Sequence, residues 1–250
     1  PVHPVVRITD EIVIYQDRTQ DDDKSAKRFK RDRDLLLKSY DKDPKDPRTL
    51  FYLAQTCECL LMYDESLFYS KLRLEYEGFQ EEKFHSYMRC ANACEKLKHT
   101  WDDYSSWYLR AYEHSSRVEP LVKLAEYYIG KEKWHVAFMF LREATTLNFP
   151  HDAILFIDNK AYDKDRWEMM LKVAQKVNAA SEIVRAAESL IKNNHSVDEA
   201  KKALETTVKV QKSTVAMEIP DNLTRKPFEE LMVQKIRQQF PLLSEKQIKQ

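Results

Sequence analysis

Three consecutive aspartates at residues 21–23 are a first candidate for chemistry in this sequence. Carboxylate oxygens are the ligands that Mg²⁺ and Ca²⁺ prefer, so such a triplet can hold a divalent ion. The triplet, however, directly precedes a long run of helix-forming residues, and acidic side chains at that place are stabilised by the positive end of a helix. We therefore predict that these aspartates precede a helix and that the chain binds no metal ion.

The four cysteines are a second candidate, because Cys and His side chains together bind Zn²⁺. They lie in predicted helical segments near His85 and His99, at Cys57, Cys59, Cys90 and Cys94. Cys57 and Cys94 take equivalent places in a repeated pattern, where a small side chain packs between two helices, and free Cys is commonly buried. We expect unpaired cysteines, no zinc site, and a reducing compartment, the cytoplasm.

The composition argues against several other kinds of site. Gly78 and Gly130 are the only glycines, whereas a dinucleotide-binding loop needs three close together and a Walker A loop needs two flanking four residues. Lys plus Arg and Asp plus Glu both number 41, so no overall charge attracts nucleic acid. No apolar run approaches the roughly 20 residues that cross a bilayer. We therefore expect no cofactor, no nucleic-acid partner and no membrane span.

The scarcity of glycine and the long stretches of Leu, Ala, Lys, Glu, Gln and Arg predict an all-α protein. Bulky aromatic residues recur in it at intervals of 34, 38, 33 and 33 residues, namely Phe29, Tyr63, Trp101, Trp134 and Trp167. This spacing is typical of tetratricopeptide repeats, in which each unit is a helix–turn–helix of about 34 residues. We interpret each aromatic residue as the start of the second helix of a pair.

Two further patterns favour the repeat. Small or apolar residues follow Trp134 at helical spacing and share one face, at Ala137, Leu141 and Ala144. A first helix containing a small residue precedes three of the aromatic residues, in the segments FYLAQTC, MRCANAC and VKLAEYY. We predict a tetratricopeptide-like α-solenoid of antiparallel helix pairs over residues 24–180, after a short extended or strand segment at residues 1–23. Residues 181–250 are expected to add a helix pair and a C-terminal helix that caps the array or binds a partner.

The first helix of each pair lines the concave side of such an array, where extended partners bind. In the predicted register six polar side chains face this side: Arg48, Gln55, His85, Asn92, Glu119 and Glu126. They either hydrogen-bond a protein, a peptide or a glycan acceptor, or are simply solvated. The sequence thus predicts a non-catalytic interaction module.

Four longer sequence segments resemble a known family. They are RDRDLLLKSYDKDPKDPRTLFYLAQT, YEGFQEEKFHSYMRCA, YLRAYEHSSRVEPLVKLAEYY and HVAFMFLREATTLNFPHDAILFIDNKAYD. Over residues 27–165 the sequence resembles the helical region that follows the catalytic domain of some bacterial and giant-virus inverting glycosyltransferases. The resemblance implies an accessory C-terminal region of a glycosyltransferase, with residues 1–23 as the end of an upstream catalytic domain.

Two alternatives stay open. PVH at residues 1–3 and IVIYQD at residues 12–17 are similar in kind to the end of that family's catalytic domain, although Pro4 stands where an acidic residue is usual. The chain would then be part of an active glycosyltransferase and contribute His3, as a catalytic candidate, to sugar transfer from a nucleotide sugar. The other alternative is an assembly scaffold unrelated to sugars.

Overall fold

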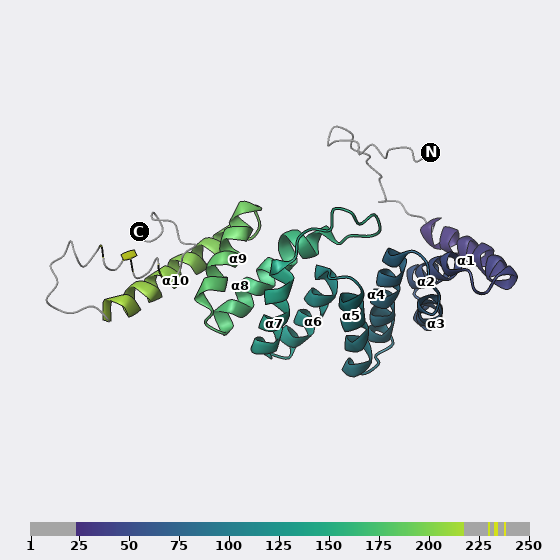
Figure 1. Cartoon of the computed structure of the whole chain (residues 1–250), viewed down its shortest axis with the longest axis horizontal. Helices are drawn as coiled ribbons and strands as arrows, with labels where there is room; N and C mark the ends of the chain where they lie inside the picture. The colour runs from purple at the N-terminus through teal and green to yellow at the C-terminus, as the bar shows by residue number, and fades with distance from the viewer. Residues whose placement is uncertain (1–23, 218–229, 231–232, 235–237, 239–250) are drawn as a thin grey trace, which may run out of the picture.

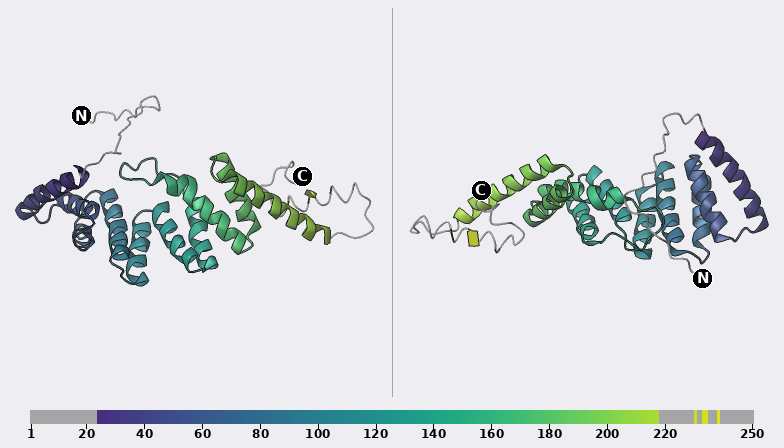
Figure 2. Two further views of the ribbon diagram at one scale, coloured as in Figure 1. Left: turned by 180° about the vertical axis from the view of Figure 1, so that it is seen from behind. Right: turned by 90° about the horizontal axis from the view of Figure 1, so that it is seen from above.

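The computed structural model describes residues 24–217 together with residues 230, 233, 234 and 238. Over these residues the protein is an elongated array of helices joined by short turns, and Figures 1 and 2 show the helices following one another along its length. In chain order the helices are α1 (Lys24–Lys42), α2 (Pro47–Cys59), α3 (Tyr63–Leu74), α4 (Gln80–Lys96), α5 (Trp101–His114), α6 (Val118–Gly130), α7 (Trp134–Thr146), the π-helical turn η1 (Ala161–Asp165), α8 (Arg166–Lys176), α9 (Ala180–Lys192) and α10 (Val197–Met217).

Consecutive helices pack against one another from α1 to α10. Since each helix buries its apolar face on its neighbours, stability comes from a continuous stack rather than from one central core. No strand occurs in the described part of the chain. The all-α helical solenoid that the sequence predicts is therefore confirmed.

The aromatic pattern marks helix starts correctly in the middle of the array. Tyr63, Trp101 and Trp134 are the first residues of α3, α5 and α7. The small and apolar residues that follow Trp134 at helical spacing are all fully buried, at Ala137, Leu141 and Ala144. Cys57 and Cys94 are buried as well, as their equivalent positions predict.

At both ends of the array the aromatic pattern is wrong. Phe29 lies inside α1 (Lys24–Lys42) rather than at the start of a helix. Trp167 is the second residue of α8, which continues η1 and packs as the first helix of a pair with α9. Its buried ring lies against the guanidinium groups of Arg166 and Arg185. A buried aromatic residue suits either helix of a pair, so spacing alone did not distinguish them.

Several predictions fall partly or wholly outside the described residues. These include the strand and the aspartates of residues 1–23, His3, and most of the C-terminal helix. The predicted boundary at residue 181 lies at the start of α9, which packs with α8 as a pair, and stays a prediction. Val233 packs against the apolar cluster formed by α8, α9 and α10.

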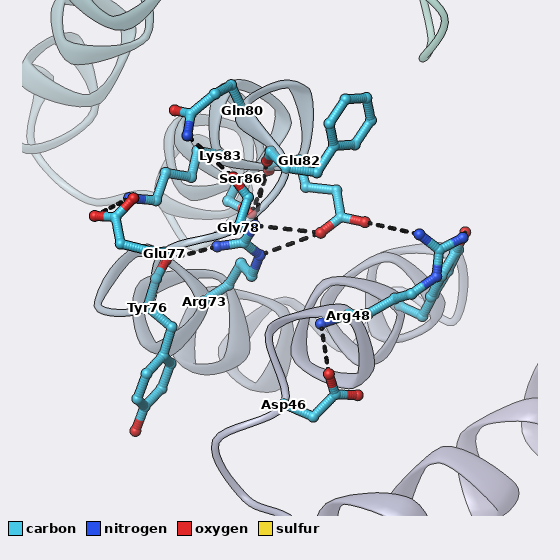
Figure 3. A network of polar contacts seen from close by, with 12 residues as sticks. Asp46, Arg48, Arg73, Tyr76, Glu77, Gly78, Gln80, Glu82, Lys83 and Ser86 are labelled. Atoms are coloured by element: carbon cyan, nitrogen blue, oxygen red, sulfur yellow. Dashed lines mark hydrogen bonds and ion pairs between the residues drawn. The ribbon is translucent and has the colours of Figure 1, made fainter. Parts of the chain in front are cut away.

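A buried arginine organises the turn between α3 and α4 (Figure 3). Arg73 is fully buried, and its guanidinium donates to the Tyr76 carbonyl at 2.9 Å, to the Phe79 carbonyl at 3.2 Å and to the Glu82 carboxylate at 3.2 Å. Gly78 sits beneath it with φ +140°, and a Cβ there would lie 3.2 Å from Nη2 of Arg73. The turn therefore needs glycine for both backbone conformation and space.

Candidate functional site

Two adjoining pockets bring together most of the predicted groove residues. The first, of about 390 Å³, is lined among others by Gln55 of α2 and by His85 and Asn92 of α4. The second, of about 260 Å³, is lined by His85 again and by Glu119 and Glu126 of α6. We call these the Gln55 pocket and the Glu119 pocket, and together the groove. Their role in binding a partner stays a prediction.

Arg48 is the predicted residue that lines neither pocket. It stands at the start of α2, where the Asp46 side chain accepts hydrogen bonds from the first backbone N–H groups of the helix. Its guanidinium lies 3.5 Å from Glu82 and donates to the Tyr52 hydroxyl at 3.2 Å. In Figure 3 it extends the Arg73–Glu82 network toward α2.

Two residues that line the Gln55 pocket, Gln55 and Arg89, each carry a buried polar atom without a hydrogen-bond partner among the described residues. Arg89 is 7% exposed; its Nε donates to Glu58 at 2.9 Å, and its guanidinium lies 5.0 Å over the Phe51 ring. Asn92 donates to the other oxygen of Glu58 at 2.5 Å. Within the described part of the chain, however, neither Nη1 of Arg89 nor Oε1 of Gln55 has a hydrogen-bond partner, although both atoms are buried.

Such atoms are costly unless something satisfies them, because a buried unpaired polar group loses about 1–3 kcal/mol. A ligand group that carries an acceptor and a donor side by side satisfies both at once. One residue of an extended peptide has this arrangement, with its carbonyl toward the guanidinium and its N–H toward the glutamine oxygen.

In the Glu119 pocket, the Glu119 carboxylate is already engaged by groups of its own chain. The buried Glu119 carboxylate binds the Arg117 guanidinium, accepts from the Tyr162 hydroxyl at 3.1 Å and lies 3.5 Å from the Asp158 backbone N–H. Burial is the main reason that the pKa of Tyr162 rises to about 12, so its hydroxyl stays protonated and donates. Glu126, by contrast, is exposed and pairs only with Lys123 at 2.9 Å among the contacts described.

The sequence interpretation missed a segment of the chain that lies against the groove. Residues 154–156, here called the strap, follow α7 and contact α4, which precedes them by some 70 residues. The Glu81 carboxylate accepts the Ile154 N–H at 2.9 Å and the Leu155 N–H at 2.6 Å. His85 Nε2 lies 3.0 Å from the Leu155 carbonyl, and its ring meets the Phe156 ring edge-on at 5.3 Å. The apolar run ILF between Pro150 and Asp158 was the available signal.

His85 is a neutral hydrogen-bond donor in this setting. Its burial is the main cause that lowers its pKa to about 4, so the imidazole is uncharged near neutral pH. Because a carbonyl can only accept, the proton must sit on Nε2 for the contact with Leu155. This arrangement suits holding a backbone rather than transferring a proton.

The cysteines and acidic groups were the other candidates for chemistry. Burial raises the pKa of Cys57 to about 11 and that of Cys90 to about 12, so both are thiols at neutral pH. All four cysteines are unpaired. No cluster of three or more His, Cys, Asp or Glu side chains there is arranged to hold a metal ion. Among these same residues, none of the helices has the length and apolar character to cross a membrane.

Comparisons with known proteins add little to this geometry. No protein-family model matches the sequence, and a search of curated proteins found no match. Among solved structures, the chain is similar to the C-terminal part of a TPR repeat-containing protein from Cytophaga hutchinsonii, with 14% identity, coverage of 90% of this chain and 95% of that chain, and a TM-score of 0.43. A similarity this distant carries no functional argument, so the site is interpreted from its own contacts.

Proposed function

We propose that this chain is a non-catalytic helical-repeat module that binds an extended peptide segment of a partner protein in its groove. The observation that supports it best is the pair of buried, unpartnered atoms in the Gln55 pocket, Oε1 of Gln55 and Nη1 of Arg89. A peptide backbone presents an N–H and a carbonyl at every residue, and in an extended segment these two groups of one residue point to the same side, so one residue can satisfy both atoms. We place this activity in the cytoplasm, since all four cysteines are free thiols.

The strap favours a peptide over a glycan as the ligand. Side chains of α4 already hold two successive backbone N–H groups and one carbonyl of a non-helical segment, residues 154–156. A peptide that continues along the groove meets the same kind of groups in the Gln55 pocket. A glycan acceptor offers hydroxyl groups, which match a charged guanidinium less specifically than a carbonyl beside an N–H.

The test is a selection from a displayed library of random 12-residue peptides, followed by titration of the winners. We expect Gln55→Leu to weaken their binding about tenfold or more. Leucine has a similar volume to glutamine but lacks the acceptor oxygen. Gln175→Leu makes the same change in a separate hollow between α8 and α10 and should leave affinity unchanged. Equal affinity for the wild type and Gln55→Leu contradicts the proposal.

The glycosyltransferase context is a separate proposal that rests on the resemblance over residues 27–165. In this context the module holds the enzyme, its glycan acceptor or a partner in place, next to an upstream catalytic domain. Reading the residues encoded before Pro1 tests it, and a gene without a transferase domain would favour the unrelated assembly scaffold instead.

The enzymatic alternative assigns sugar transfer partly to this chain through His3, which lies outside the described residues. Titrating nucleotide sugars with a divalent ion into the chain alone should give no binding if the module is non-catalytic. Metal-dependent binding would contradict that. In the full-length enzyme, His3→Ala should abolish transfer under the alternative, with folding unchanged, and retained activity would exclude it.

A further inference from the structure

Resting on the proposed function, we infer that the strap is a built-in competitor of the groove's ligand. The partner segment is a peptide whose backbone reproduces residues 154–156: two successive backbone N–H donors, the carbonyl that follows them and an aromatic side chain beside His85. The strap covers these contacts until a partner displaces it. The groove is therefore regulated by the chain's own loop.

The contacts that hold the strap are almost entirely contacts to its backbone. Glu81 accepts two N–H groups, His85 donates to the Leu155 carbonyl, and Arg117 lies 3.4 Å from the Phe156 carbonyl. Backbone groups are the same in every peptide. A foreign segment can therefore replace the strap contact by contact without sharing its whole sequence.

The strap also buries little of its own apolar surface. Ile154 and Phe156 are 73% and 55% exposed. Few contacts therefore oppose their release. Phe156 has φ +38°, in a region that bulky side chains rarely adopt. Segments with exposed apolar residues and strained backbone belong to the least stable part of a fold.

The chain on both sides of the strap packs against one apolar cluster, through Phe149 before the strap and Ile157 after it. On its C-terminal side, Ile157 packs against the apolar cluster of α6, α7 and η1, and the Asp158 N–H faces Glu119. On its N-terminal side, the loop from α7 reaches back toward α4 (Figure 1). Displacement is thus a local release of residues 154–156, between Phe149 and Ile157.

Phe156 connects the strap to the proposed partner site. Its side chain lines both the Gln55 pocket and the Glu119 pocket. A change in its position alters both hollows at once. Release of the strap consequently opens one continuous surface from α2 to α6.

The experiment uses the strap itself as the probe, as a labelled synthetic peptide with the sequence of residues 149–158, FPHDAILFID. The double substitution Ile154→Pro and Leu155→Pro removes both N–H groups that Glu81 accepts, while every groove residue stays intact. A tethered segment competes at an effective concentration on the order of millimolar. We therefore expect the proline variant to bind the peptide at least tenfold more tightly than the wild type.

The matched control is Ile154→Ala with Leu155→Ala, which shortens the same side chains but keeps both N–H groups. It should bind the peptide as weakly as the wild type. Adding Glu81→Ala to the proline variant should abolish its gain in affinity. Equal binding by all three proteins, or no binding by a proline variant with an intact helical circular-dichroism spectrum, overturns the inference.

A second measurement avoids any substitution in the strap. Hydrogen exchange of the ¹⁵N-labelled wild type is followed by NMR while unlabelled peptide is added in excess. Exchange at the Ile154 and Leu155 amides should accelerate, while exchange in the middle of α4 stays constant. Unchanged exchange at both strap amides under saturating peptide overturns the inference.

These results separate the strap from the proposed function. If the proline variant binds the strap peptide but no displayed peptide depends on Gln55, the competitor is real and the partner site is wrong. If displayed peptides depend on Gln55 and bind the wild type and the proline variant equally, the partner site is real and the strap does not compete for it.

Discussion

Two buried arginines of the same helical array differ in how far their hydrogen bonds are satisfied. All three guanidinium nitrogens of Arg73 donate to groups of its own chain, which fixes the turn before α4. Arg89, which lines the Gln55 pocket, has partners in Glu58 and Phe51, but its buried Nη1 is unpaired among the described residues. The difference separates a side chain that stabilises the fold from one that can bind a partner, although both are buried cations.

The largest expected effect comes from breaking the satisfied site. Arg73→Ala leaves the Glu82 carboxylate with only the exposed guanidinium of Arg48. Removing one partner of a buried ion pair costs roughly 3–5 kcal/mol, and we expect a loss of that order in the free energy of unfolding, measured with urea. Arg73→Met combined with Glu82→Gln should lose less, because no unpaired charge stays buried. A loss below about 1 kcal/mol for Arg73→Ala would remove the contrast with Arg89.

The next effect concerns His85 in the groove and depends on pH. Its folded pKa of about 4 is below the ordinary histidine value of 6.5, so the unfolded chain binds the proton more readily. The stabilisation that comes from uncharged His85 is therefore fully present above pH 6.5. As the pH falls toward 4, the free energy of unfolding decreases by about 3 kcal/mol. His85→Gln keeps a side-chain N–H donor but does not titrate. Parallel unfolding curves for the two proteins between pH 7 and pH 4 would contradict this prediction.

A smaller loss is expected at the turn beneath Arg73. Gly78→Ala places a Cβ 3.2 Å from Nη2 of Arg73 at a φ of +140°, and we expect a loss of about 1–2 kcal/mol in thermal or urea unfolding. Gly130→Ala is the matched control, because a Cβ there meets nothing within 4 Å. It ends α6, so the change should be neutral or slightly stabilising. Equal losses of stability at the two glycines would show that the turn beside Arg73 accommodates a Cβ at residue 78.

The smallest effect on stability is expected where the effect on binding is largest. Gln55→Leu removes a buried acceptor that has no described partner, so the free energy of unfolding should stay within about 1 kcal/mol of the wild type or rise slightly. Binding of groove peptides should nevertheless fall. A clear loss of stability would show that Gln55, like Arg73, serves the fold.

Local patterns predicted the helices well. A helix is stabilised by residues three and four apart, so the spacing of Trp134, Ala137, Leu141 and Ala144 already specifies which face is buried. The same reasoning placed Gln55, His85 and Asn92 on one face, and the structure brings them to one pocket. It misplaced Trp167, because its burial depends on which neighbouring helix covers it.

By itself, the sequence determined the all-α class, the starts of α3, α5 and α7, and the absence of phosphate-binding loops, since these follow from residue types and short spacings. Only the tertiary structure decided that Tyr162 donates to Glu119 and that the strap lies on α4. It also decided that Gln55 and Arg89 line one pocket, with Oε1 of Gln55 and Nη1 of Arg89 unpaired among the described residues. Such contacts join residues tens of positions apart. Their geometry depends on how successive helix pairs are rotated against one another, which no local spacing records.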